Sequence, residues 1–123
     1  MKIISTPISR RTVLKEYSHY FRKLIKAVVD IKKQIIAIDA ELHADLEALL
    51  LEKGSKQEDL WGINLYLEEE KDEQIEYTAL INIRPSLNNK WMEVEDPQIR
   101  EKIKDIVNRL IVDVVPNCCD EDC

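Results

Sequence analysis

Three ionisable residues at alternate positions, Glu41, His43 and Asp45, are the side chains best suited to chemistry in this sequence. Carboxylate and imidazole groups together are ligands for zinc, manganese or iron ions. They lie in the segment 38–50, in which every second residue is apolar. If this segment is a β-strand, the three side chains share one face, because side chains alternate between the faces of a strand. Neighbours on that face are about 7 Å apart, so a bulge would have to bring three ligands to one ion.

Two further polar residues, Asn82 and Arg84, alternate in a later predicted strand and would add an amide and a cation to this site. The carboxylates are expected to raise the pKa of His43, because opposite charge favours the protonated ring. One hypothesis is therefore a metal-dependent, hydrolase-like enzyme that uses Glu41, His43 and Asp45. Arg84 and Asn82 would assist it. The alternative is the solvated face of a sheet, with Arg84 paired to a glutamate across strands. The cofactor is accordingly none or a divalent metal.

The conformation of residues 41–53 decides between these interpretations. All seven alternate positions of 38–50 are apolar, which favours a strand. A helix is the competing interpretation, because Leu42, Leu46, Leu49 and Leu50 share a helical face and Ala, Leu and Glu are strong helix formers. We predict a strand, bent or bulged partway, with a short helical turn as the alternative.

The remaining elements are predicted from the period of their apolar residues. In chain order they are a helix over 10–26, strands over 27–31 and 35–39, strands over 60–67 and 75–84, and a helix that starts at Pro97 and ends before Pro116. The predicted fold is α+β, a mostly antiparallel β-meander of about four to five strands covered by N-terminal and C-terminal amphipathic helices. A single domain is expected over 1–115, with an acidic tail over 116–123.

The cysteines and the hydropathy restrict the class of protein. All three cysteines, Cys118, Cys119 and Cys123, lie in the predicted tail, so no disulfide framework is expected in the domain. No apolar run approaches the roughly 20 residues of a membrane span. The N-terminus has no pattern of a signal peptide, so we expect a cytoplasmic protein without a membrane partner.

Charge is distributed unevenly along the chain. Residues 1–34 carry nine basic and two acidic residues, which gives +7, whereas residues 35–123 carry nine basic and 22 acidic residues, which gives −13. A nucleic-acid-linked regulator, such as a toxin–antitoxin component, would use the basic residues Arg10, Arg11, Arg22, Lys23 and Lys26. The net charge of −6 argues against nucleic acid as a partner, because it repels phosphate.

A partner contact is predicted at Trp91 and Met92, which lie together in an irregular loop over 86–95. Exposed tryptophan is enriched at the energetic centres of protein interfaces. The alternative for Trp91 is ordinary packing over the edge of the sheet. A small sheet also has edges and a face to protect, and dimerisation is a common way to cover them. The leading hypothesis is therefore a small cytoplasmic binding or assembly module that forms a homo-oligomer and has no catalysis of its own.

Several segments together resemble a known family. They are AVVDI at 27–31, ELHAD at 41–45, LLEKGSKQEDLWGINLY at 50–66 and INIRPS at 81–86. The chain resembles, over roughly residues 1–112, a family of small prokaryotic proteins known only as a domain of unknown function. The resemblance implies a soluble protein and supplies no activity, ligand or catalytic residue. The cysteine-containing tail lies outside it.

Overall fold

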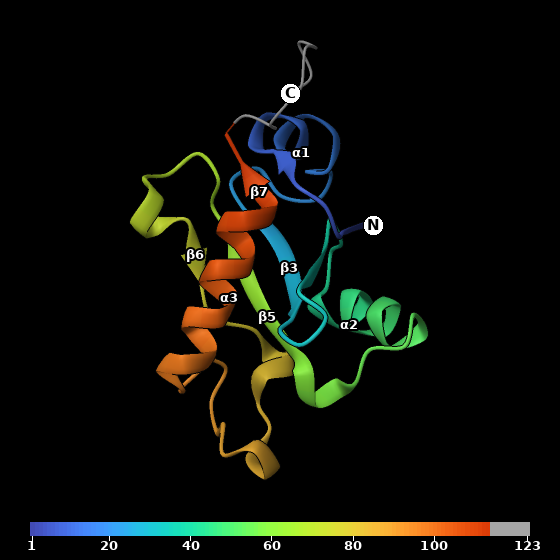
Figure 1. Cartoon of the computed structure of the whole chain (residues 1–123), viewed down its shortest axis with the longest axis vertical. Coiled ribbons are helices and arrows are strands. Elements are labelled where there is room, and N and C mark those ends of the chain that lie inside the picture. Colours follow the sequence, from blue (N-terminus) through green and yellow to red (C-terminus); the bar gives the residue numbers. More distant parts are fainter. Residues whose placement is uncertain (114–123) are drawn as a thin grey trace.

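A computed structural model describes residues 1–113 of the chain, so the three cysteines and the predicted tail over 116–123 lie outside the described residues. Its main feature is a five-stranded sheet in the order β1-β4-β3-β5-β6, in which every neighbouring pair is antiparallel (Figure 1). The strands are β1 (Lys2–Ile4), β3 (Ile25–Asp30), β4 (Ile35–Ile38), β5 (Leu60–Leu65) and β6 (Ile75–Glu76). A short parallel pair joins β2 (Ile8–Ser9) to β7 (Ile111–Val112).

Three α-helices accompany the sheet: α1 (Arg10–Glu16), α2 (His43–Glu52) and α3 (Pro97–Leu110). The predicted α+β class and the mostly antiparallel sheet are therefore confirmed. The connection between β4 and β5 is not the turn of a meander, because β3 lies between these two strands and α2 crosses over it. None of the helices described within residues 1–113 is long and apolar enough to cross a bilayer.

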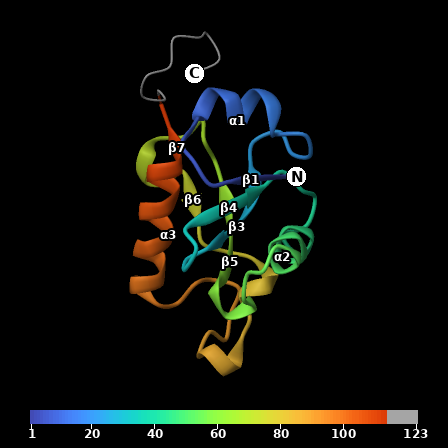
Figure 2. The same cartoon turned by 45° about the vertical axis from the view of Figure 1, so that its right-hand side comes forward.

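The two faces of the sheet bury different sets of apolar residues, because side chains alternate along each strand. On one face, α3 contributes its buried stripe to a core with Ala27, Val29 and the large side chain of Trp61. On the other face, Leu46 and Leu50 of α2 pack with a smaller cluster that includes Val28, Ala37 and Leu60. Figure 2 shows α3 and α2 on opposite sides of the strands.

The first predicted helix is shorter than expected. Ser9 caps it as its sequence suggests, since the Ser9 Oγ accepts a hydrogen bond from the backbone N–H of Thr12 at 3.0 Å. The helix ends at Glu16 instead of continuing to residue 26. The chain leaves the helix at Tyr17, whose φ of −130° and ψ of 37° are not helical. Further along, the backbone N–H of His19 donates to the Asp39 carboxylate at 2.9 Å, a partner 20 residues away.

The predicted strand over 38–50 is wrong beyond Ile38. β4 ends there, Asp39 adopts a left-handed backbone conformation with φ 71°, and α2 starts at His43. Leu46 and Leu50, one helical turn apart, are fully buried against the sheet. The apolar face of β3 and β4 accepts a helix, and the helix propensity of Ala, Leu and Glu agrees with it. The alternation of apolar residues did not indicate a strand here.

The predicted strand over 75–84 is largely wrong as well. Only Ile75 and Glu76 form β6, and two 3₁₀ turns, Leu80–Asn82 and Pro85–Leu87, follow. The C-terminal helix begins as predicted, because the Asp96 carboxylate accepts the backbone N–H of Gln98 at 2.8 Å and Pro97 occupies the first turn.

Candidate functional site

His43 begins α2, and its ring lies over β5 at Gly62. The His43 Nε2 donates a hydrogen bond to the carbonyl oxygen of Ile63 at 2.8 Å. Gly62 leaves the space that the ring needs, because a Cβ at Gly62 would lie 3.2 Å from the His43 Cδ2 and only 2.5 Å from the Cβ of Ala79. The glycine is therefore required by close packing.

The electrostatics of His43 differ from the expectation. Burial lowers the pKa of His43 from its usual value of 6.5, and the charge of Lys26 lowers it further. Hydrogen bonds to Ile63 and Asn64 oppose these effects without reversing them. The prediction of a raised pKa is wrong, because loss of solvent outweighs any attraction from neighbouring carboxylates.

Asn82 completes the outer edge of β5 next to His43. Its Oδ1 accepts the backbone N–H of Gly62 at 2.8 Å, and its Nδ2 donates to the carbonyl of Gly62 at 2.9 Å. The side-chain amide thus makes the two hydrogen bonds that a neighbouring strand would make. This explains why the chain beyond β6 leaves the sheet without exposing the edge of β5 at this residue.

Arg84 forms a hydrogen bond to the same edge of β5 at Leu60, two residues before Gly62. Its Nη1 donates to the carbonyl of Leu60, and its Nη2 lies 2.8 Å from the Glu47 Oε2 in α2. The side chains of Arg84 and Glu47 are only 10% and 15% exposed, and the guanidinium lies 5.4 Å from the centre of the Trp61 ring. Arg84 is therefore paired with a glutamate, but from a helix and not across strands.

Glu41 and Asp45 lie apart from His43 because the segment is helical. Both are exposed and line a hollow of about 360 Å³ together with Met1, Tyr20 and other residues, and His43 is not part of that lining. Within residues 1–113, no three His, Cys, Asp or Glu side chains gather closely enough to hold a metal ion. The structure thus brings His43 and Asn82 together at Gly62 but separates His43 from its two predicted carboxylate partners.

A second buried asparagine, Asn89, fixes residues 78–95, which we call the apolar loop. Its Nδ2 lies 2.8 to 2.9 Å from the carbonyl oxygens of Asn82, Trp91 and Glu93, and its Oδ1 accepts the backbone N–H of Glu95 at 2.8 Å. Asn82 adds a bond from its Nδ2 to the carbonyl of Met92 at 3.0 Å. The two amides hold the loop from the inside, so its outer side chains are presented on a defined backbone.

The apolar loop exposes an unusual number of large apolar side chains. Leu80 is 73% exposed and Trp91 is 71% exposed, and the exposed set also contains Ile83, Leu87 and Met92. The loop forms the end of the molecule opposite α1 (Figure 1). Single exposed apolar residues are normal, whereas a contiguous exposed apolar patch is typical of an interaction site. Trp91 and Met92 were predicted as contacts from sequence, whereas Leu80 and Ile83 were assigned to a strand.

His19 and Asp39 form a pair that the sequence did not suggest. The His19 Nδ1 lies 2.5 Å from the Asp39 Oδ2, and the Asp39 Oδ1 accepts the backbone N–H of His19 at 2.9 Å. The side chain of Asp39 is 5% exposed, whereas that of His19 is 66% exposed. No local pattern joins two residues 20 positions apart.

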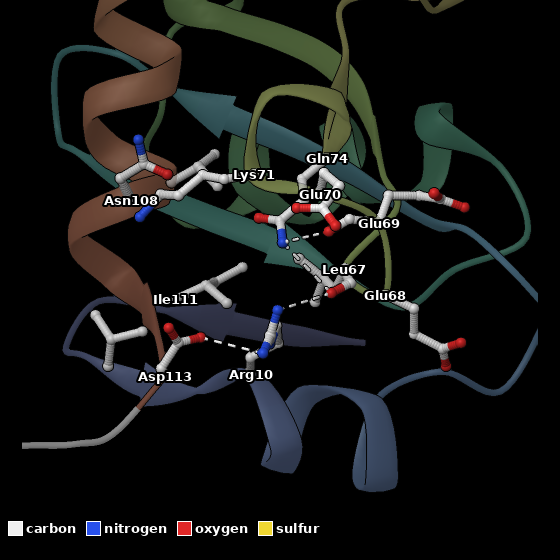
Figure 3. A pocket seen from close by; sticks show the side chains of 12 residues that line it. Arg10, Leu67, Glu68, Glu69, Glu70, Lys71, Gln74, Asn108, Ile111 and Asp113 are labelled. Carbon is white, nitrogen blue, oxygen red and sulfur yellow. Dashed lines mark hydrogen bonds and ion pairs between the residues drawn. The ribbon is translucent and has the colours of Figure 1, made fainter.

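A polar cavity of about 370 Å³ lies between α3, Arg10 and the segment 67–74 (Figure 3). The Arg10 guanidinium donates to the carbonyl of Leu67 at 3.2 Å and lies 3.3 Å from the Asp113 carboxylate. In Figure 3, the carboxylates of Glu68 and Glu69 point away from Arg10. The lining mixes two cations with four carboxylates, so its charge selects no single class of ligand.

The basic residues considered for nucleic acid, Arg10, Arg11, Arg22, Lys23 and Lys26, do not all remain available. Arg10 is engaged with Leu67 and Asp113, and the Lys26 ammonium lies 4.9 Å from the centre of the Phe21 ring.

Comparison with known proteins gives a family and no activity. No curated protein and no solved structure matches the chain. A family model described as "Protein of unknown function (DUF5674)" matches residues 2–110, which is nearly all of the chain that the structure describes. The chain therefore belongs to the DUF5674 family of proteins of unknown function.

Proposed function

We propose that this protein is a small binding module that assembles with a second copy of itself through the apolar loop. One observation carries the proposal: five large apolar side chains are exposed on a loop whose backbone is fixed by the buried amides of Asn82 and Asn89. A fixed loop loses little conformational entropy on binding, so more of the gain from apolar burial remains as affinity. Trp91, at 71% exposure, is the expected centre of the contact.

The charge of the apolar loop favours a second copy as the partner. In a two-fold symmetric interface each surface meets itself, so an excess of one charge would be repelled. Within 78–95 the basic residues Arg84 and Lys90 balance the acidic residues Glu93 and Glu95, which gives a net charge of zero. The whole chain carries −6, so two copies repel each other over most of their surfaces. The apolar loop has no net charge, so two copies of the chain can approach each other there.

Sedimentation velocity over a wide concentration range tests the proposal. We expect a concentration-dependent dimer in the unaltered protein and a monomer in Trp91→Asp, because the substitution would bury a charge in the interface. Leu51→Asp is the matched control, since Leu51 is 40% exposed but lies on α2, and this variant should still dimerise. A protein that stays monomeric up to roughly 1 mM, where a binding free energy of only about −4 kcal/mol is enough, refutes the proposal.

Fluorescence supplies an independent readout. Trp61 is buried at 2% exposure in the monomer, so only Trp91 is expected to change environment on assembly. A blue shift that grows with concentration and is absent from Trp91→Phe would support an interface at the loop. A dimer without that shift would place the interface elsewhere.

A further inference from the structure

We propose that His19 is a nucleophilic histidine that accepts a phosphoryl group on Nε2, with Asp39 as its positioning residue. The inference is independent of assembly through the apolar loop. It begins with the hydrogen bond between the His19 Nδ1 and the Asp39 Oδ2 at 2.5 Å. An ionised carboxylate only accepts hydrogen bonds, so the neutral form of the His19 ring carries its proton on Nδ1 and its lone pair on Nε2. The ring is 66% exposed, which leaves it open to an incoming group.

Asp39 holds this geometry at a cost in its own conformation. Its φ of 71° lies in the left-handed region that residues other than glycine seldom adopt, and its side chain is almost fully buried. The carboxylate also accepts the backbone N–H of His19, so both the main chain and the ring of His19 are fixed by the same group. A buried carboxylate that orients one ring nitrogen of a histidine and leaves the other free is the arrangement that prepares histidine for nucleophilic or basic roles.

Two roles are open to such a histidine: it can accept a phosphoryl group, or it can act as the general base of an active site. The surroundings of His19 favour the first role. The neighbouring hollow of about 360 Å³ is lined by Tyr20 and Ala40 but not by His19, so the His19 ring does not line this substrate-sized hollow. A donor that brings its own binding surface would reach the ring from solvent. The segment 15–26 contains four Lys or Arg residues and one carboxylate, Glu16, whereas the neighbouring hollow is lined by the carboxylates of Glu41, Asp45 and Glu52. The proposal therefore rests on the orientation and exposure of the His19 ring and not on the local charge.

The chemical step balances without another reactant. The lone pair on the His19 Nε2 attacks the phosphorus of phosphoramidate in its form protonated on nitrogen, a nitrogen–phosphorus bond to His19 forms, and the bond between phosphorus and the ammonium nitrogen of the donor breaks. That nitrogen already carries three protons, so it leaves with the bonding electron pair as neutral ammonia. The proton stays on the His19 Nδ1, and the positive charge that develops on the ring is stabilised by the Asp39 carboxylate.

The test uses phosphoramidate as the probe, with intact-mass spectrometry and ³¹P NMR on the full chain. The chain has two histidines, so His43 is an internal control. We expect one phosphoryl group, lost in His19→Gln and retained in His43→Gln. The rate should fall about tenfold in Asp39→Asn, because the introduced amide keeps the bond to the His19 backbone but donates to Nδ1 and moves the ring proton to Nε2. Asparagine also tolerates a left-handed φ, so this variant should fold.

Nitrogen-15 NMR of the ring separates positioning from a purely structural contact. The unaltered protein should show the tautomer protonated at Nδ1, and Asp39→Asn the tautomer protonated at Nε2. Absence of phosphorylation would overturn the proposal. It would also be overturned by labelling of His43 at the rate of His19, by an Asp39→Asn variant as reactive as the unaltered protein, or by a His19 tautomer protonated at Nε2 in the unaltered protein.

Discussion

Replacing Asn82 with alanine is expected to destabilise the protein strongly, although Asn82 lies in a segment without regular strand structure. The Asn82 side chain is fully buried and makes three hydrogen bonds to the backbone: two with Gly62 and one with the carbonyl of Met92. Alanine would leave the backbone N–H and carbonyl of Gly62 without this partner, whereas the carbonyl of Met92 still accepts the backbone N–H of Ala79 at 3.1 Å. Each buried polar group left unpaired costs about 1 to 3 kcal/mol, so we expect a loss of about 2 to 6 kcal/mol in the free energy of unfolding.

Urea denaturation followed by circular dichroism measures this loss. A domain of this size is stabilised by about 5 to 15 kcal/mol, so the transition should move to a much lower urea concentration. Asn82→Asp should be at least as destabilising at neutral pH, because it keeps the acceptor but places a carboxylate against two carbonyl oxygens. Asn108→Ala is the control, since Asn108 is half-buried on α3 and no side-chain hydrogen bond is described for it within residues 1–113.

The reasoning would be refuted by a loss of less than about 1 kcal/mol in Asn82→Ala. Such a result would mean that water replaces the amide at the edge of β5. An equally large loss in Asn108→Ala would show that the assay does not distinguish buried amides from half-buried ones.

Two further substitutions test the packing and the charge of His43. Gly62→Ala should cost about 1 to 3 kcal/mol of stability, because the new Cβ would lie 2.5 Å from the Cβ of Ala79, and a loss below about 0.5 kcal/mol in urea denaturation would contradict this. The pKa of His43 lies below 6.5 in the folded protein, so the unfolded chain binds the proton more readily. The stability contributed by neutral His43 is therefore complete above pH 6.5 and is lost as the pH falls below that value. His43→Gln should remove this part of the pH dependence of the urea midpoint, whereas an unchanged slope would show that His43 is not the group responsible.

The sequence predicted best where a short local signal decides the structure. Asp96 followed by Pro97 fixes the start of α3, because both the capping carboxylate and the missing N–H of proline act within one turn. The strands predicted over 27–31 and 35–39, which are rich in β-branched residues, correspond to β3 and β4. Most side chains of these two strands are buried, on both faces of the sheet. These elements require no knowledge of distant residues.

The candidate site was predicted poorly because its contacts are distant in sequence. Alternation over 38–50 placed Glu41, His43 and Asp45 on one strand face, but burial of Leu46 and Leu50 against the sheet selected a helix. Asn82 and Arg84 were predicted to add an amide and a cation to a catalytic site, but their partners in the structure are backbone groups of β5 and the Glu47 carboxylate. The helix α1 ended earlier than predicted, and the pairing of His19 with Asp39 had no signal in the local sequence.

The exposure of Trp91 came from the structure, whereas the sequence by itself determined the α+β class, the mostly antiparallel sheet and the start of the C-terminal helix. These features depend on side-chain period, capping and turn chemistry, which act over a few residues. Only the tertiary structure decided which polar groups meet, because each contact that defines His19, His43, Asn82 and Arg84 joins residues at least ten positions apart. A polar side chain finds its partner through the packing of whole elements, and that packing is set by the burial of apolar faces across the entire chain.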